Sequence, residues 1–222
     1  MPGLPAGLPA VNAATAFILA NTTLAPVPAL PEIRLHQGDD AFTLWEQTEH
    51  ALKEPDRQPP FWGFAWPGGL AMARYLLDHP GEVAGRRVLD LGSGSGLTAI
   101  AAVLAGAAQV TASELDPFAI AAITANAAAN EVRVSTTGDV LDTDPDTDLV
   151  LAADIWYERQ LAARALAFVT RARAKGASVL VGDVGRAFLP RTALRELAAY
   201  EVPVMAGLES APVKRALILT LR

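Results

Sequence analysis

A regular alternation of strand-like and helix-like segments, which begins near residue 87, constrains the fold of this chain more than any other feature of its sequence. Strand-like segments lie at 87–91, 109–113, 132–136, 148–153, 177–182 and 213–221, and helix-like segments lie at 96–105, 117–129, 158–174 and 190–199. Strands that are apolar throughout, such as "LVLAA" and "SVLVG", are typical of a parallel sheet that is covered by helices on both faces. The alternation therefore predicts a doubly wound α/β fold with a mostly parallel sheet.

The part of the chain before this alternation has a different character. Prolines are frequent in residues 1–31, and a short extended piece followed by a helix is expected across "PEIRLHQGDDAFTLWEQTEHAL". Pro67 is placed to open a further helix, which Pro80 ends. We expect residues 1–66 to form a mainly helical or irregular N-terminal extension that packs on the core, and residues 67–222 to form the α/β domain of a single globular unit.

Composition excludes several classes of protein. With 51% hydrophobic and 19% charged residues, the 222-residue chain is not expected to be disordered. The absence of cysteine removes thiolate catalysis and the usual zinc ligands, and His36, His50 and His79 are too scattered for a metal site. We therefore expect no bound metal.

Charge and hydropathy bear on partners and location. A net charge of −6 without a basic stripe disfavours nucleic acid as a partner, because neutralising phosphates supplies most of that affinity. No apolar run is long enough for a membrane span. A signal peptide begins with a positively charged segment, but no Lys or Arg precedes Arg34. We expect a cytoplasmic protein without membrane contact.

The loop "VLDLGSGSG" between the first regular strand and its helix is the strongest candidate for a ligand site. It departs from the dinucleotide pattern G-x-G-x-x-G/A, because Leu97 stands where a small residue is needed, and it lacks the lysine of a phosphate-binding P-loop. It matches (D/E)-x-G-x-G-x-G, the loop of class I S-adenosylmethionine-dependent methyltransferases, at every position. The matching residues are Asp90, Gly92, Gly94 and Gly96.

The chemistry of that ligand agrees with the loop. S-adenosylmethionine carries no phosphate but two cationic groups, an ammonium and a sulfonium. Asp90 would repel a pyrophosphate, whereas it can hydrogen-bond the ammonium directly or through water. The glycines allow the backbone to lie against the ligand. A plain structural turn is the alternative for this loop considered alone.

Further acids follow successive strands at the edge where parallel sheets bind ligands. Glu114 ends the second strand, where an acidic residue takes ribose hydroxyls in nucleotide binders. Asp139 follows the third strand and can accept the adenine amino group, and Asp154 follows the fourth. Asp116 is better explained as a helix cap, because Pro117 comes next. The set favours an S-adenosylmethionine-dependent methyltransferase.

The sequence also resembles a known family. The blocks "PPFWGFAWPGG", "LAADIWYE" and "VLVGDVGRAFLP", with the intervening glycine loop, are similar to bacterial relatives of the electron transfer flavoprotein β-subunit lysine methyltransferases. These belong to the seven-β-strand methyltransferases labelled family 16, also called nicotinamide N-methylase-like. The likeness covers roughly residues 30–220. It implies a seven-stranded sheet, and the Asp-x-x-Tyr at 154–157 is typical of the protein methyltransferases of that family.

The resemblance implies transfer of a methyl group to a lysine of a protein, with the electron transfer flavoprotein β-subunit as candidate and S-adenosylhomocysteine as product. Asp154 and Tyr157 would grip the lysine. Trp62 or Trp66 would lie over the cofactor, although both could instead attach the N-terminal extension to the domain. Relatives have Pro where this chain has Val184, so we expect a less rigid loop there, with consequences for the substrate rather than the cofactor.

Other functions are also compatible with the sequence. The protein could methylate a nitrogen or oxygen of a small molecule, or ribosomal proteins could be its target. It could also be an inactive cofactor-binding module, although the intact "DIWY" argues against that. At the level of residues, Asp154 could cap the next helix, with Tyr157 packed beneath it.

Overall fold

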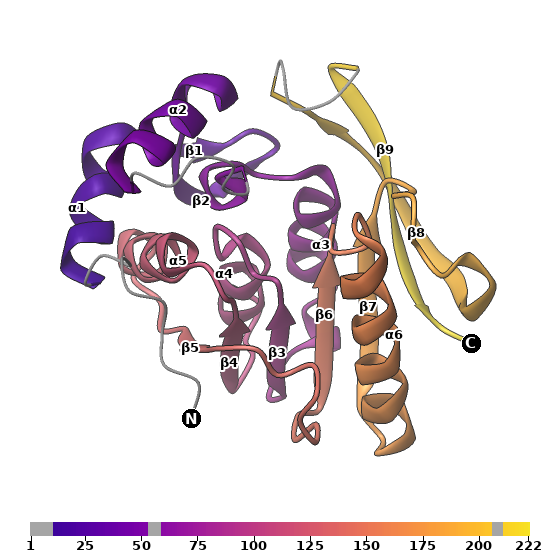
Figure 1. Cartoon of the computed structure of the whole chain (residues 1–222). Coiled ribbons are helices and arrows are strands. Elements are labelled where there is room, and N and C mark those ends of the chain that lie inside the picture. Colours follow the sequence, from indigo (N-terminus) through magenta and orange to yellow (C-terminus); the bar gives the residue numbers. More distant parts are fainter. Residues whose placement is uncertain (1–10, 53–58, 206–210) are drawn as a thin grey trace.

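The computed structural model describes residues 11–52, 59–205 and 211–222 and shows helices on both faces of one sheet (Figure 1). Its helices are α1 (Val11–Asn21), α2 (Ala41–Leu52), α3 (Pro67–Asp78), α4 (Leu97–Leu104), α5 (Pro117–Ala129) and α6 (Arg159–Ala174), with short 3-10 turns η1 (Phe61–Gly63), η2 (Pro80–Glu82) and η3 (Arg191–Ala193). Its strands are β1 (Thr23–Val27), β2 (Leu30–Gln37), β3 (Arg87–Leu91), β4 (Gln109–Ser113), β5 (Ser135–Thr137), β6 (Leu149–Ala153), β7 (Ser178–Asp183), β8 (Leu194–Pro203) and β9 (Val213–Leu221).

The main sheet has seven strands in the order β5-β4-β3-β6-β7-β9-β8. Strands β5, β4, β3, β6 and β7 are parallel to one another, whereas β9 pairs antiparallel with both β7 and β8. The four central parallel strands are buried almost throughout, as a sheet covered on both faces requires. The predicted doubly wound, mostly parallel α/β fold is confirmed.

The predicted helix at 190–199 is wrong. Only the turn η3 forms there, and β8 follows and pairs with β9 from Leu194 to Pro203. The sequence "LRELAAYE" is rich in good helix formers, so its local preference favours a helix. Hydrogen bonding to β9 decides the outcome, because pairing and burial in a sheet override a preference of a few tenths of a kcal/mol per residue.

Local signals at the other helix ends are confirmed. Pro67 begins α3, and the Asp116 side chain caps α5 by accepting a hydrogen bond from the Phe118 backbone N–H at 2.9 Å. Gly106 and Gly176 follow the ends of α4 and α6 with φ of 96°, a conformation that favours glycine.

The N-terminal region packs closely on the α/β core. Strand β2 and helix α2 confirm the short extended piece followed by a helix, whereas β1 and its antiparallel pairing with β2 were not predicted. Ile33 and Leu35 of β2 are fully buried in the same core as α3 and α4. The predicted boundary after residue 66 stays a prediction.

Asn126 of α5 and Asn130, which follows the end of α5, both bond to that hairpin, and Asn126 also bonds to the glycine loop. Asn126 accepts a hydrogen bond from the His36 N–H at 2.7 Å and donates one to the Ser95 carbonyl at 2.8 Å. Asn130 exchanges two hydrogen bonds with the backbone of Arg34. Because Asn126 is fully buried, its two bonds connect β2 directly to the loop that follows β3.

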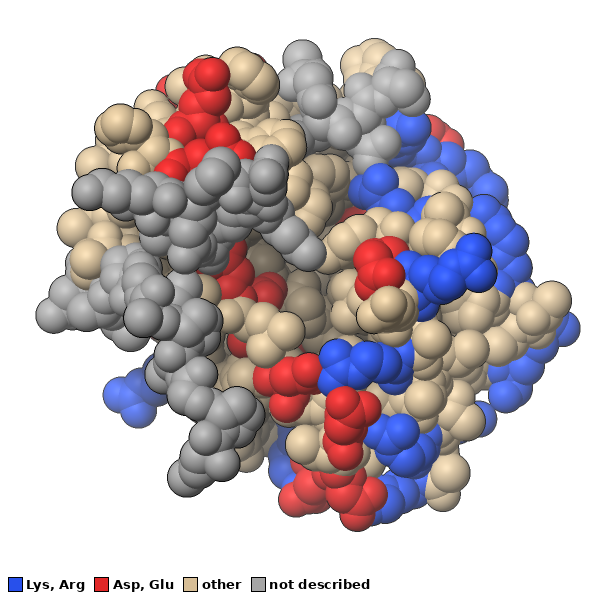
Figure 2. All heavy atoms as spheres, in the orientation of Figure 1, with Lys and Arg blue, Asp and Glu red and all other residues tan. Residues whose placement is uncertain are grey.

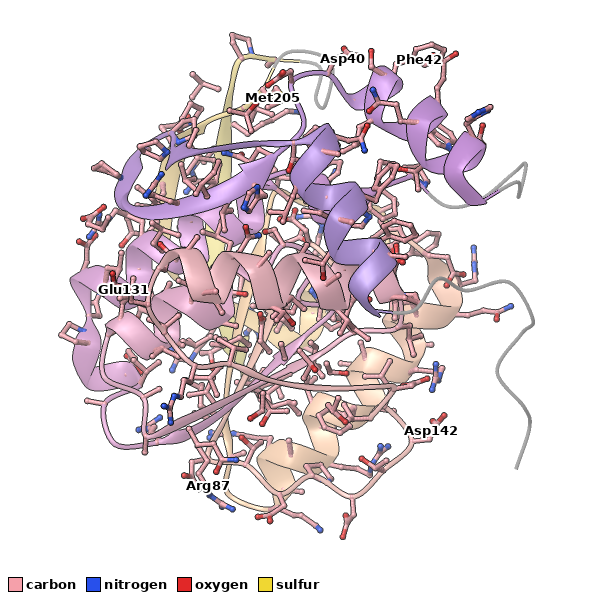
Figure 3. All side chains as sticks on the ribbon, turned by 90° about the vertical axis from the view of Figure 1, so that its left-hand side faces the viewer. Asp40, Phe42, Arg87, Glu131, Asp142 and Met205 are labelled. Carbon is pink, nitrogen blue, oxygen red and sulfur yellow. The ribbon has the colours of Figure 1, made fainter. Side chains whose placement is uncertain are left out.

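The two ends of the parallel strands lie at opposite ends of the molecule. Arg87, where β3 begins, is at the end opposite Asp40, Phe42 and Met205 (Figure 3). The carboxyl ends of β3, β4 and β6 point towards the latter end (Figure 1). In the described parts of the chain, no helix combines the length and apolarity needed to cross a membrane.

Candidate active site

A cavity of about 830 Å³ opens at the carboxyl ends of β3, β4 and β6. The hollow and the acidic side chains beside it are visible on the face drawn in Figure 2, where Lys and Arg gather mainly on the side of α6, β8 and β9. Of the residues proposed from the sequence, those that line the cavity are Trp66, Gly92, Gly94, Glu114, Asp139, Asp154 and Tyr157. Trp62, Asp90 and Gly96 do not line it.

The glycine loop takes a shape that larger residues would strain. Gly92 has φ of 58°, and a Cβ atom on it would lie 2.8 Å from Ile155 Cγ2. Gly94 has φ of 55°, but a Cβ atom there would meet nothing within 4 Å. Gly92 is therefore needed for packing as well as for its backbone conformation. Gly94 is needed for its backbone conformation alone, because a Cβ atom there would meet no neighbouring atom.

Asp90 lies beneath the loop rather than in the cavity wall. Its Oδ2 atom accepts hydrogen bonds from Ser93 Oγ at 2.5 Å and Thr98 Oγ1 at 2.6 Å. Burial raises the pKa of Asp90 to about 6, although those two hydrogen bonds lower it. Its Oδ1 atom is buried and accepts no hydrogen bond from the described residues. Such an orphaned oxygen fits a site that receives a cationic group or a bridging water.

Glu114 and Asp139 stand in the wall on the side of β4. Glu114 accepts hydrogen bonds from the backbone N–H of Leu115 at 2.7 Å and of Gly94 at 3.0 Å, and burial raises its pKa. Asp139 accepts one from the Leu141 N–H and forms an ion pair with Arg164 of α6 at 2.7 Å. The ion pair between Arg164 and Asp139 was not predicted, because nothing in the sequence of α6 indicates which acidic residue Arg164 contacts.

The two tryptophans have different places. Trp62 is 1% exposed and stacks on Phe118 of α5, with its ring centroid 6.0 Å from that of Phe118. Its proposed position over the cofactor is therefore not supported, and it attaches the N-terminal region to the core instead. Trp66 lines the cavity, and its indole N–H donates to the Phe61 carbonyl at 2.9 Å.

Asp154 follows β6 and is held on two sides. Its Oδ2 atom accepts the Gly69 backbone N–H at 3.0 Å, and its Oδ1 atom pairs with Arg186 Nη2 at 3.1 Å. Burial raises the pKa of Asp154 to about 6, while the charge of Arg186 lowers it and that of Asp183 raises it. Gly68 is required beside it, since a Cβ atom there would lie 2.6 Å from Asp154 Oδ2.

The alternative that Asp154 caps the next helix is wrong. Glu158 caps α6, because its carboxylate accepts the backbone N–H groups of Gln160 and Leu161, each at 2.7 Å. Tyr157 is not packed beneath that helix either. It is 41% exposed at the cavity, with its ring 5.5 Å from that of Phe61.

Arg186 is the main residue of the site to which no role was assigned from the sequence. Its guanidinium pairs with Asp154 and lies over the Trp66 ring, 5.6 Å from the centroid. The side chain of Asp183 accepts the N–H groups of Gly185 and Arg186 at 2.5 and 2.7 Å and so shapes the loop. The signal was present in "GDVGR", which begins at the carboxyl end of β7 and therefore lies at the same edge of the sheet as Asp154.

Comparison with known proteins agrees with this geometry. A family model for ribosomal protein L11 methyltransferase (PrmA) matches residues 72–161. The electron transfer flavoprotein beta subunit lysine methyltransferase of Danio rerio is 37% identical over 196 residues, which cover 84% of this chain and 75% of that protein. The protein of the same name from Xenopus laevis is 38% identical over 187 residues, which cover 82% of this chain and 74% of that protein.

Solved structures share the fold. A putative RNA methyltransferase from Pyrococcus horikoshii superposes with a TM-score of 0.55 over 81% of this chain and 98% of that one. The sequences are 15% identical, so this likeness concerns the architecture and not the substrate.

Proposed function

The chain belongs to the family of electron transfer flavoprotein beta subunit lysine methyltransferases, and on that basis we propose that its substrate is a lysine of the beta subunit of electron transfer flavoprotein. It is an S-adenosylmethionine-dependent methyltransferase with the α/β fold described above. The Asp154 carboxylate carries the assignment of the acceptor site, because it lies in the cavity wall and does not cap α6.

The residues present fit the cofactor. The wall offers carboxylates and glycine backbone rather than lysines, which suits a ligand with cationic groups and no phosphate. We assign the ribose hydroxyls to Glu114, the adenine amino group to Asp139 and the surroundings of the methionine ammonium to Asp90 with its loop. When bound, S-adenosylmethionine supplies a methyl group on a cationic sulfur, which departs with the bonding electrons as neutral S-adenosylhomocysteine.

The acceptor residues act mainly by positioning. Asp154 accepts a hydrogen bond from the lysine nitrogen and aims its lone pair, and Tyr157 borders the path by which the side chain enters. Holding two reactants in line contributes roughly 7–11 kcal/mol in favourable cases, so little acid or base catalysis is needed. We place this reaction in the cytoplasm, without nucleic acid or membrane as partner.

The test is transfer of label from S-adenosylmethionine to purified electron transfer flavoprotein beta subunit and, separately, to a lysate of the source cells. A single labelled protein that comigrates with the beta subunit supports the proposal. Label on ribosomal protein L11 identifies a different protein substrate, and label in the small-molecule fraction refutes protein transfer. Asp154→Asn is expected to reduce labelling at least about a hundredfold. Asp146→Asn, which changes an exposed partner of Arg87 at the opposite end of the parallel strands, is the matched control.

A further inference from the structure

Arg186 and Asp154 form an ion pair in the cavity wall. Arg186 Nη2 lies 3.1 Å from Asp154 Oδ1, and the two side chains are 20% and 10% exposed. The second Asp154 oxygen is occupied by the Gly69 N–H. The acceptor lysine of the proposed function would therefore approach a carboxylate whose charge is already balanced.

Arg186 is held in place by groups that do not depend on Asp154. The Asp183 side chain accepts its backbone N–H at 2.7 Å, and the Trp66 ring lies against its guanidinium at 5.6 Å from the centroid. Other titratable groups face the same region: Asp183 at the end of β7, Glu114 at the end of β4, and Tyr157 and Glu158 after β6. From α3, the Gly69 N–H donates to Asp154, and Gly68 lies against the same carboxylate.

Methyl transfer needs an amine that has lost its proton, since only then is a lone pair available. An unbalanced buried carboxylate would stabilise the protonated ammonium, whereas a neighbouring cation stabilises the neutral amine. Burial raises the pKa of Asp154 to about 6, and the charge of Arg186 opposes this rise. Without Arg186, the Asp154 carboxylate would bind the protonated form of the lysine more strongly than the neutral amine.

We infer that Arg186 is a positioning residue that balances the charge of Asp154, so that this carboxylate orients the acceptor lysine as a neutral amine. The amine first releases its proton to water. Its lone pair then forms the N–C bond as the C–S bond breaks with its electrons on sulfur. This inference rests on the proposed lysine acceptor and assigns Arg186 a part in acceptor deprotonation.

The experiment compares kcat and KM for the beta subunit across pH 6–10 in wild type, Arg186→Gln and Arg186→Lys. We expect the pH midpoint of kcat to rise by about one unit in Arg186→Gln, so that kcat is about tenfold lower near pH 7 and recovers at high pH, while KM does not rise. Arg186→Lys keeps a cation and the wild-type midpoint. Arg195→Gln, which removes an exposed arginine of β8, is the control for net charge.

Two outcomes overturn the inference: a loss in Arg186→Gln that is equal at every pH, or a shifted midpoint in Arg186→Lys. If Arg186→Gln alone does not fold, Asp154→Asn/Arg186→Gln removes both charges and is expected to fold. In this double variant, kcat at high pH should be low, but the pH midpoint of kcat should lie near that of wild type. A midpoint that is shifted by about one pH unit contradicts the role of Arg186. A wild-type enzyme that labels no protein refutes the proposed function instead.

Discussion

Replacement of Asp154 by asparagine should lower the rate of methyl transfer much more than it lowers the stability of the protein. The carboxylate accepts two hydrogen bonds, from Gly69 N–H at 3.0 Å and Arg186 Nη2 at 3.1 Å, and φ at this residue is 54°. Asparagine tolerates that backbone conformation, but its amide nitrogen cannot accept from either donor. Loss of one charged hydrogen bond costs about 1.5–3 kcal/mol, which relief from burying a carboxylate partly offsets. We expect the free energy of unfolding to fall by about 1–2 kcal/mol, so that the variant folds.

The effect of the same variant on catalysis should be much larger. Without a carboxylate to orient the lysine, we expect kcat to fall at least about a hundredfold, which corresponds to roughly 2.7 kcal/mol. Affinity for S-adenosylhomocysteine, measured by calorimetry, should change by less than about threefold. Methyl transfer to the beta subunit gives kcat, and urea denaturation gives the stability. A variant that retains kcat within about threefold of wild type would refute the role of Asp154.

The remaining predictions concern the cofactor side and the core. Asp90→Ala should weaken cofactor binding by about 1.5–3 kcal/mol in calorimetry, and unchanged affinity contradicts the assignment. Because the pKa of Asp90 is raised to about 6 in the fold, its own contribution to stability should fall as pH rises from about 4 to 6, so in urea titrations the stability of wild type relative to Asp90→Asn should fall over that range. Gly92→Ala should destabilise the protein more than Gly94→Ala, by about 1–3 kcal/mol in thermal unfolding, and equal effects refute the packing argument. Trp62→Ala should cost about 3–5 kcal/mol of stability, whereas Trp66→Ala should mainly weaken cofactor or acceptor binding, and the reverse order contradicts their placement.

Much of the framework can be predicted from the sequence because it depends on local periodicity. The apolar strands, the proline and aspartate that open helices, and the glycines with positive φ act within a few neighbouring residues. Parallel strands bring their carboxyl ends to one edge, so the sequence alone predicts that Glu114, Asp139 and Asp154 lie together. The glycine loop with Asp90 likewise indicated a cationic ligand rather than a phosphate.

The tertiary structure decided what depends on contacts between distant segments. Residues 194–203 have the local preference of a helix but become β8, because they pair with β9. The partners of Asp154 are Gly69 and Arg186, which lie 85 and 32 positions away in the chain. The sequence alone named the acid but could not name its counter-ion. Charge balance at the acceptor site is a property of the packed fold, because electrostatic interaction depends on separation and burial in space and not on distance along the chain.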